Sequence, residues 1–207
     1  LQGSVFDVLG IERVLVNLVG RMCGVATLTK QYLDATSDAE VLLTATRKTV
    51  CGLLDKRAVC VGGGYPHRLS LSDAVLVKDN HLALYKGDVN FLLENILKVE
   101  SDVRFIEVEV ESLEQALHVA GAVERVRVKE GMILPFFLLL DNMKPEKVRQ
   151  TVEELKKSKL HENLFLEASG GINLGNISEY AKTGVDVISS GSLTSVARNL
   201  DLSLEAA

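Results

Sequence analysis

The stretch that decides the fold lies near the C-terminus, and it reads LFLEASGG from Leu164 to Gly171 and then VDVISSGS from Val185 to Ser192. In both runs an apolar segment of strand length ends in serine and glycine, and a helical segment follows. Runs as apolar as these are typical of strands that are buried on both faces in a parallel sheet. They therefore predict consecutive strands of an α/β sheet, each leading into a glycine-containing turn.

Four earlier runs have the same character. They extend from Val41 to Ala45, Ala74 to Val77, Arg104 to Val110 and Phe136 to Leu140. Helical patterns alternate with the runs, and their start signals are the caps Asp88 and Ser112 and the first-turn residue Pro145. This alternation predicts an α/β fold with right-handed crossovers. No dinucleotide-binding glycine fingerprint and no P-loop is present, so we expect a TIM-like β/α barrel, complete or reduced to seven strands.

The first forty residues predict helices that precede the barrel. One helix is indicated by apolar residues at the spacing of a single helix face, namely Ile11, Val14, Leu15, Leu18, Val19 and Met22. A second helix is expected from about Thr27 to Ser37. We therefore assign residues 1–40 to a helical lead-in and residues 41–207 to the catalytic barrel.

Composition limits the possible functions. The chain has 207 residues, 47% of them hydrophobic, and a net charge of -5, which offers no electrostatic footprint for nucleic acid. Its apolar runs are too short to cross a membrane, and no signal peptide pattern opens the chain, so we expect a cytoplasmic location. Cys23, Cys51 and Cys60 lack metal-ligand spacing and are expected to be buried, reduced thiols.

Basic side chains follow the first two predicted strands. Arg47 and Lys48 come directly after the first strand, Lys78 follows the second, and His67 and Arg68 lie between them. The carboxyl ends of strands in a β/α barrel meet at one rim, where active sites lie. Guanidinium and ammonium groups gathered there predict a site for carboxylates and a pyrophosphate. His67 is equally compatible with a structural role.

Two carboxylates end neighbouring strands. Glu109 and Asp141 are expected to hold Mg²⁺ or ribose hydroxyls, because Mg²⁺ prefers one or two carboxylates together with substrate oxygens. Glu107 and Glu111 share the strand face of Glu109, so the sequence leaves open which of the three points into the site. Asp141 could instead cap the helix that starts at Pro145.

The last two strand ends predict a phosphate site. Glycine lets the backbone approach an anion closely, serine adds a hydroxyl donor, and a following helix presents free N–H groups. The residues concerned are Ser169, Gly170, Gly171, Ser190, Gly191 and Ser192. The alternative is that both segments are merely tight strand-to-helix turns.

Several long motifs resemble, in order, those of the quinolinate phosphoribosyltransferase family. They are TRKT at 46–49, GGG at 62–64 with His67-Arg68, VKDNH at 77–81, IEVEVE at 106–111, LDN at 140–142, EASGG at 167–171 and TGVD at 183–186. The resemblance covers essentially the whole chain. It implies transfer of the phosphoribosyl group of phosphoribosyl pyrophosphate to quinolinate with Mg²⁺, followed by decarboxylation to nicotinate mononucleotide, a precursor of NAD.

The resemblance also implies residue roles. Arg47, His67, Arg68 and Lys78 would contact the quinolinate carboxylates, and Lys48 the pyrophosphate. Glu109 and Asp141 would contact the ribose and Mg²⁺, and the Ser169 and Gly191 loops the 5′-phosphate. The family further implies a preceding domain of roughly a hundred residues and a homodimer or larger homo-oligomer whose subunits share active sites.

Two alternatives remain open at this point. One is an enzyme of the same fold with another acceptor, such as the pyrophosphorylase homologues associated with molybdenum transport. The other is a non-catalytic sensor of a phosphate ligand. The set Arg47, His67, Arg68 and Lys78 argues against the first, and the presence of Lys48 with two carboxylates argues against the second.

Overall fold

The computed structural model describes residues 3–85, 87–98, 103–131 and 134–205. Its strands are β1 (Leu42–Ala45), β2 (Val75–Val77), β3 (Ile106–Val110), β4 (Phe136–Asp141), β5 (Phe165–Ser169) and β6 (Val187–Ser190). Its helices are α1 (Val5–Ala35), α2 (Leu53–Val61), α3 (Asp79–Leu84), α4 (Val89–Leu97), α5 (Leu113–Glu130), α6 (Pro145–Lys157), α7 (Ile177–Ala181) and α8 (Ser192–Ser195). Each of the six expected strands is present, with bounds shifted by at most two residues.

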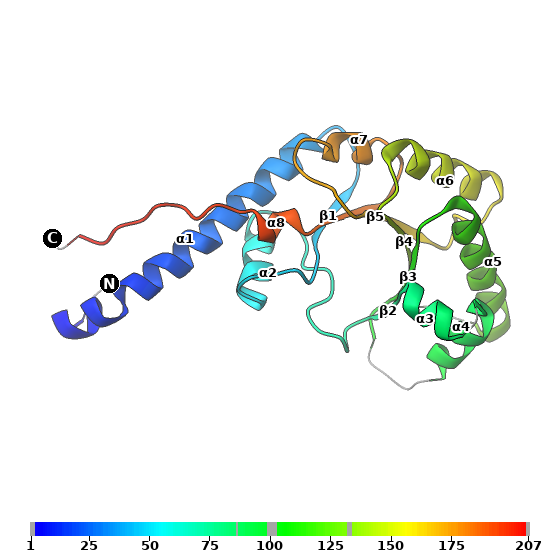
Figure 1. The fold of residues 1–207 in the computed structure, drawn as a ribbon, viewed down its shortest axis with the longest axis horizontal. Coiled ribbons are helices and arrows are strands. Elements are labelled where there is room, and N and C mark those ends of the chain that lie inside the picture. Colours follow the sequence, from blue (N-terminus) through cyan, green and yellow to red (C-terminus); the bar gives the residue numbers. More distant parts are fainter. Residues whose placement is uncertain (1–2, 86, 99–102, 132–133, 206–207) are drawn as a thin grey trace.

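All strand pairs are parallel, and the sheet has the order β1-β6-β5-β4-β3-β2. The strands form an arc with helices α4 to α7 on its outer side (Figure 1). The α/β barrel-like class is thus confirmed, but within the described residues the sheet does not close, because β1 and β2 are its two edges. Among the described residues, an isolated bridge between Thr44 and Tyr65 is the only pairing beyond the β1 edge, and no seventh strand forms there.

The predicted helix starts are confirmed by their hydrogen bonds. The Asp88 side chain accepts from the Phe91 N–H at 3.0 Å and the Ser112 hydroxyl accepts from the Gln115 N–H at 3.2 Å, so each satisfies an amide that the helix itself leaves unpaired. Pro145 occupies the first turn of α6. The residue that caps α6 is Lys144, so the alternative role of Asp141 as a helix cap is wrong.

The expectation of two helices before the barrel is also wrong, because α1 is a single helix of 31 residues. Gly24 lies in its middle, where a Cβ atom would come within 1.9 Å of the Arg198 carbonyl oxygen. The C-terminal segment runs beside the helix (Figure 1), and the Leu200 N–H donates to the Gly20 carbonyl at 2.9 Å. These glycines therefore serve close packing and do not break the helix.

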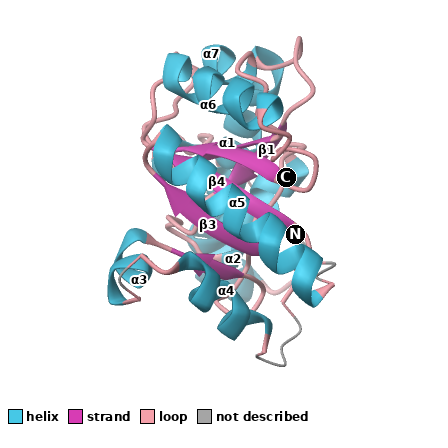
Figure 2. Ribbon diagram, turned by 90° about the vertical axis from the view of Figure 1, so that its right-hand side faces the viewer, coloured by secondary structure: helices cyan, strands magenta, loops and turns pink. Residues whose placement is uncertain are grey.

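The core lies between the sheet and the outer helices. Ile106, Val108, Leu138 and Leu166 have exposed fractions of 0%, and α5 packs over this part of the sheet (Figure 2). Because side chains alternate along a strand, the residues between them face the inside of the arc. On β3 and β5 these inner residues include glutamates, and this alternation is what delivers charged groups to the interior.

The three cysteines are free thiols, as expected, but they are half-buried, so the expectation that they are buried is wrong. Among the described residues, no helix is long and apolar enough to span a membrane.

Candidate active site

A pocket of about 490 Å³ lies at the carboxyl ends of the strands. Every residue that the sequence predicted for the site lines it: Arg47, Lys48, His67, Arg68, Lys78, Glu109, Asp141, Ser169, Gly170, Gly171, Ser190, Gly191 and Ser192. These residues come from β1, β2, β3, β4, β5 and β6 and the segments that follow them. The parallel order of the sheet therefore accounts for their convergence.

The segment that carries Arg47 and Lys48 is held from outside the pocket. Asp55, which is fully buried, accepts hydrogen bonds from the N–H groups of Val50 and Cys51 at 2.8 and 3.0 Å. Arg21 of α1 pairs with the same carboxylate through two nitrogens, at 3.0 and 3.1 Å. Burial opposes ionisation of Asp55, but the Arg21 and backbone hydrogen bonds outweigh it and lower the pKa of the carboxyl. The charged Asp55 thus fixes the segment between β1 and α2.

The His67–Arg68 segment is held by a buried lysine. Lys56 of α2 is 4% exposed, and its Nζ donates to the carbonyl oxygens of Ala45 at 3.1 Å, Arg68 at 3.0 Å and Pro66. Burial, together with the charges of nearby arginines, lowers the pKa of Lys56 to about 8. His67 has φ of 54°, a conformation that costs a non-glycine residue free energy. The Lys56 hydrogen bonds on both sides of His67 support that conformation.

On the opposite side of the pocket, cation and carboxylate meet directly. Lys78 Nζ lies 2.6 Å from Glu109 Oε2, and the Lys78 backbone N–H donates to His81 Nδ1 at 2.9 Å. His81 thus braces the turn that begins α3. Burial, followed by the charge of Glu109, raises the pKa of Asp141. Two carboxylates that repel each other in this way form a site that favours a cation.

The two glycine loops differ from each other. Ser190-Gly191-Ser192 leads directly into α8, which is a single turn. Ser169-Gly170-Gly171 is separated from α7 by five residues, 172–176, so the expectation that a helix starts directly after this loop is wrong. Gly170 and Gly171 have φ of 89° and 65°, and a Cβ on Gly170 would come within 2.3 Å of Asn142 Oδ1. This loop therefore offers backbone amides and a hydroxyl without a helix N-terminus.

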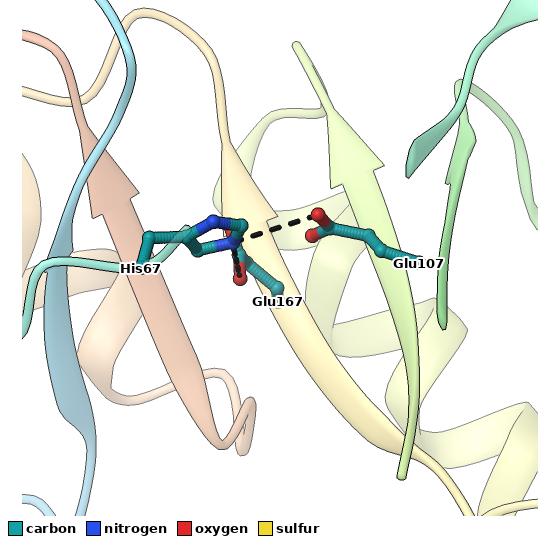
Figure 3. Close-up of side chains that lie close together, drawn as sticks. All are labelled: His67, Glu107 and Glu167. Atoms are coloured by element: carbon teal, nitrogen blue, oxygen red, sulfur yellow. Dashed lines mark hydrogen bonds and ion pairs between the residues drawn. The ribbon is translucent and has the colours of Figure 1, made fainter. Parts of the chain in front are cut away.

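At the base of the pocket, His67 lies between two glutamates from different strands (Figure 3). Its Nε2 is 3.2 Å from Glu167 Oε2 and 3.5 Å from Glu107 Oε2. The two glutamates are 1% and 0% exposed. Burial alone would lower the pKa of His67, but the hydrogen bonds and charges of the two carboxylates raise it to about 10.

The structure thus resolves what the sequence left open about the β3 glutamates. Glu107 and Glu109 both line the pocket, whereas Glu111 is exposed and is not among the lining residues. Glu167 was missed as a site residue, although strand alternation places it on the same face as Ser169, and this signal could have found it. Lys56 was missed too, and a lysine within a helical segment gives no comparable signal.

Comparison with known proteins agrees with this arrangement. Residues 25–205 match the model of the family described as quinolinate phosphoribosyl transferase, C-terminal domain. A probable nicotinate-nucleotide pyrophosphorylase [carboxylating] of Methanothermobacter thermautotrophicus is 41% identical, over 99% of this chain and 71% of that protein. The corresponding protein of Mycobacterium leprae is 38% identical, over 99% and 68%. The crystal structure of NadC from Streptococcus pyogenes superposes with a TM-score of 0.81 at 35% identity, covering 99% of this chain and 66% of that one.

Proposed function

The chain belongs to the quinolinate phosphoribosyl transferase family, and we propose that it transfers the phosphoribosyl group of phosphoribosyl pyrophosphate to the ring nitrogen of quinolinate. Loss of the 2-carboxyl as CO₂ then gives nicotinate mononucleotide, a precursor of NAD, and pyrophosphate leaves. The observation that carries this proposal is the single pocket in which a cationic wall, two carboxylates and two serine-glycine loops face one another. Such a pocket can hold a dicarboxylic acid, a pyrophosphate and a phosphate together.

The acceptor is assigned to the side of the pocket that the α2 scaffold supports. Arg47, Arg68 and Lys78 would pair with the two quinolinate carboxylates, with His67 between them. Arginine provides a planar pair of donors that matches a carboxylate, and the ring would thereby be oriented with its nitrogen towards the sugar. The buried Lys56 supports this assignment, since it fixes the main chain on both sides of His67.

The donor is assigned to the remainder of the rim. The Ser169-Gly170-Gly171 and Ser190-Gly191-Ser192 loops would bind the 5′-phosphate, and Lys48 would face the pyrophosphate. Lys48 lies beside the second loop, because a Cβ on Gly191 would come within 3.5 Å of the Lys48 side chain. Lys48, which would stabilise the leaving pyrophosphate, would therefore lie next to the loop that binds the 5′-phosphate of the same ribose.

Glu109 and Asp141 would lie at the reacting carbon. The bond from C1′ to the pyrophosphate oxygen breaks as the bond from C1′ to the ring nitrogen forms, and C1′ carries a positive charge in the transition state. Carboxylates that are already in place stabilise such a charge. After transfer, the bond between ring carbon 2 and its carboxyl breaks, CO₂ leaves, and the carbon takes up a proton.

We also propose that Glu109 and Asp141 hold Mg²⁺. The raised pKa of Asp141, which burial and the charge of Glu109 cause, is consistent with a pair of carboxylates that a divalent cation would relieve. The ion would neutralise charge on the pyrophosphate. The part of the chain given by the structure contributes these two carboxylates, and substrate oxygens would complete the coordination.

We further propose that the protein acts as a homodimer or larger homo-oligomer. In support, α1 exposes seven large apolar side chains towards its N-terminal end, namely Val5, Phe6, Leu9, Ile11, Val14, Leu18 and Val19. Apolar patches of this kind mark interaction surfaces. Sedimentation at micromolar concentration tests the proposal, and the mass of a single chain would contradict it.

The activity is tested by incubating the protein with quinolinate, phosphoribosyl pyrophosphate and Mg²⁺. We expect CO₂, pyrophosphate and nicotinate mononucleotide in equal amounts. Binding of phosphoribosyl pyrophosphate without turnover of quinolinate would favour a sensor. Turnover with another acceptor, and none with quinolinate, would favour the type associated with molybdenum transport.

A further inference from the structure

Glu107 and Glu167 are an unusual pair because both are buried and, among the described residues, both share His67 as their ion-pair partner. Among the described residues, Glu107 Oε1 and Oε2 and Glu167 Oε1 have no hydrogen-bond partner by strict geometry. Their nearest cationic group is the His67 ring, at 3.2 and 3.5 Å. Two carboxylates in one apolar interior are costly unless a positive charge or a proton lies between them.

The geometry of the ring decides what His67 can do. Nε2 faces the two carboxylates, as the dashed lines in Figure 3 mark, whereas Nδ1 is separated from Nε2 by one ring carbon and its N–H would point away from them. No hydrogen bond to Nδ1 is made by the residues that the structure describes. A neutral ring carries only one N–H, and the carboxylates engage it at Nε2. Nδ1 can therefore donate to a bound anion only if the ring is an imidazolium.

We propose that Glu107 and Glu167 are positioning residues that hold His67 as an imidazolium, so that Nε2–H donates to Glu167 within ion-pair distance of Glu107 and Nδ1–H is directed at the acidic substrate. The proposal rests on the acceptor role given above to His67. It assigns the two glutamates a function in recognition of a dicarboxylate, although neither of them is expected to touch it. Burial and the charge of Glu167 raise the pKa of Glu107, so the pair keeps at least one negative charge at neutral pH, and that charge at the base of the pocket supports a positive donor above it.

The other charges around the ring act in the opposite direction. Arg68 adjoins His67 in the chain, Arg47 lies in the segment after β1, and the Lys56 Nζ lies at the neighbouring carbonyls. All three disfavour another positive charge. These cations are not in contact with the ring, however, whereas the carboxylates are. Because Coulomb energy falls with distance, the carboxylates have the larger effect on the charge of the ring. Phe105 adds no charge and fixes the ring edge-on, with centroids 5.4 Å apart.

Nitrogen-15 NMR of histidine-labelled protein measures the charge of the ring directly. The chain has four histidines, and a His67→Gln sample assigns the signal. The samples are first treated with a chelator, because imidazole and carboxylates also bind metals. We expect both ring nitrogens of His67 to be protonated from about pH 6 to about pH 8.5. In Glu107→Gln/Glu167→Gln, one proton should be lost well below pH 7, since burial and the neighbouring cations then act unopposed.

Two controls keep this result interpretable. Glu153→Gln on α6 removes an exposed charge far from the pocket and should leave the titration unchanged. The single variants Glu107→Gln and Glu167→Gln, checked by circular dichroism, replace the double variant should it not fold, and each should lower the ring pKa. A wild-type His67 that is neutral at pH 7, or a titration that the glutamate variants do not change, would overturn the proposal.

Calorimetry with quinolinate separates this inference from the proposed function. Wild-type affinity should be nearly constant between about pH 6.5 and pH 8.5. The double variant should lose roughly ten- to a hundredfold in affinity over that interval, as expected for one charge-assisted contact. Absence of quinolinate binding by the wild type would count against the proposed acceptor, while a charged His67 in the NMR experiment would still stand.

Discussion

At the scale of single residues, the pocket presents Lys48 and Lys78 at the ends of different strands. Both side chains are exposed, and Lys78 makes its ion pair with Glu109 at the rim. We expect Lys48→Ala and Lys78→Ala to lower kcat/KM by roughly ten- to a hundredfold, the effect of one charge-assisted contact. The free energy of unfolding should change by only about 0.5 kcal/mol, because exposed positions contribute little.

Steady-state kinetics and urea titration of the same samples check this prediction. Lys147→Ala, an exposed substitution on α6, serves as the control and should change neither quantity by much. Near-normal turnover in either pocket variant would show that the lysine has been given the wrong role.

His67 gives the stability a pH dependence with a definite sign. Its pKa in the folded protein is about 10, raised by the two carboxylates against the effect of burial, and an unfolded histidine has a pKa of about 6.5. The folded state therefore holds the extra proton, and the stabilisation is complete below pH 6.5 and lost as pH rises to 10. We expect the contribution of His67 to fall by about 1 kcal/mol per pH unit between pH 7 and 9.

The comparison with Glu107→Gln/Glu167→Gln isolates this contribution. Lys56, whose pKa burial lowers to about 8, adds the opposite slope above that pH in both proteins. Urea titrations at several pH values should therefore show a steeper decline in the wild type than in the double variant. Equal slopes would mean that His67 does not carry a raised pKa.

Whether a site residue could be predicted from the sequence depends on its position relative to the strands. Arg47, Lys78 and Asp141 directly follow apolar strands, and the strand ends were predictable. Glu167 lies inside β5, where strand alternation places it on the pocket face with Ser169, but its approach to His67 and to Glu107, which lies on β3 beyond the intervening β4, is not visible in the sequence. Lys56 bonds to carbonyls ten or more residues away, and this depends on the path of the main chain. Local patterns contain neither kind of information.

At the scale of elements, α1 shows why helix boundaries were harder to predict than strands. The sequence predicted one helix with apolar residues up to Met22 and a second from about Thr27, and the interval between them contains Gly24, a residue that weakens a helix in isolation. In the folded chain, Gly24 admits the Arg198 carbonyl, so a tertiary contact explains the glycine. Gly24 and Arg198 are far apart in the sequence, so the sequence alone does not reveal their contact.

Substitution within α1 tests this explanation. Gly24→Ala should displace the C-terminal segment, because the new Cβ would lie 1.9 Å from the Arg198 carbonyl oxygen. We expect faster hydrogen exchange of the Leu200 amide, which donates to Gly20, and a loss of roughly 1–3 kcal/mol in the free energy of unfolding. Gly10→Ala, with no atom within 4 Å, should instead gain up to about 1 kcal/mol. Equal changes in the free energy of unfolding for the two variants would show that packing against Arg198 does not explain Gly24.

The β5 loop offers a second matched pair of glycines. Gly170→Ala places a side chain at φ of 89° and within 2.3 Å of Asn142 Oδ1, whereas the Cβ of Gly171→Ala meets nothing within 4 Å. We expect Gly171→Ala to cost about 1 kcal/mol, the strain of a left-handed residue. Gly170→Ala should cost more and should also weaken phosphoribosyl pyrophosphate binding, as measured by calorimetry. The reverse order would contradict the described loop conformation.

At the scale of the whole molecule, the pocket is built across an open sheet. Its phosphate loops and Arg47 belong to the side formed by β5, β6 and β1, and Lys78 belongs to β2 at the other edge. The two edges are not hydrogen-bonded to each other in the described residues, and the segment after Tyr65 connects them. A ligand that contacts both sides should therefore couple them, whereas one confined to the phosphate loops should not.

Nicotinate mononucleotide and inorganic phosphate distinguish these cases. At a hundred times its dissociation constant, the mononucleotide should add about 2.7 kcal/mol to the free energy of unfolding. For a chain of this size that corresponds to a rise in Tm of roughly 5–10 °C. Hydrogen exchange should slow in β2 as well as in the loops after β5 and β6, because the ring would reach Lys78 while the phosphate stays in the loops. Phosphate at an equal multiple of its own dissociation constant should protect the two loops alone. Protection of β2 by phosphate, or none there by the mononucleotide, would place the two ends of the ligand differently in the pocket.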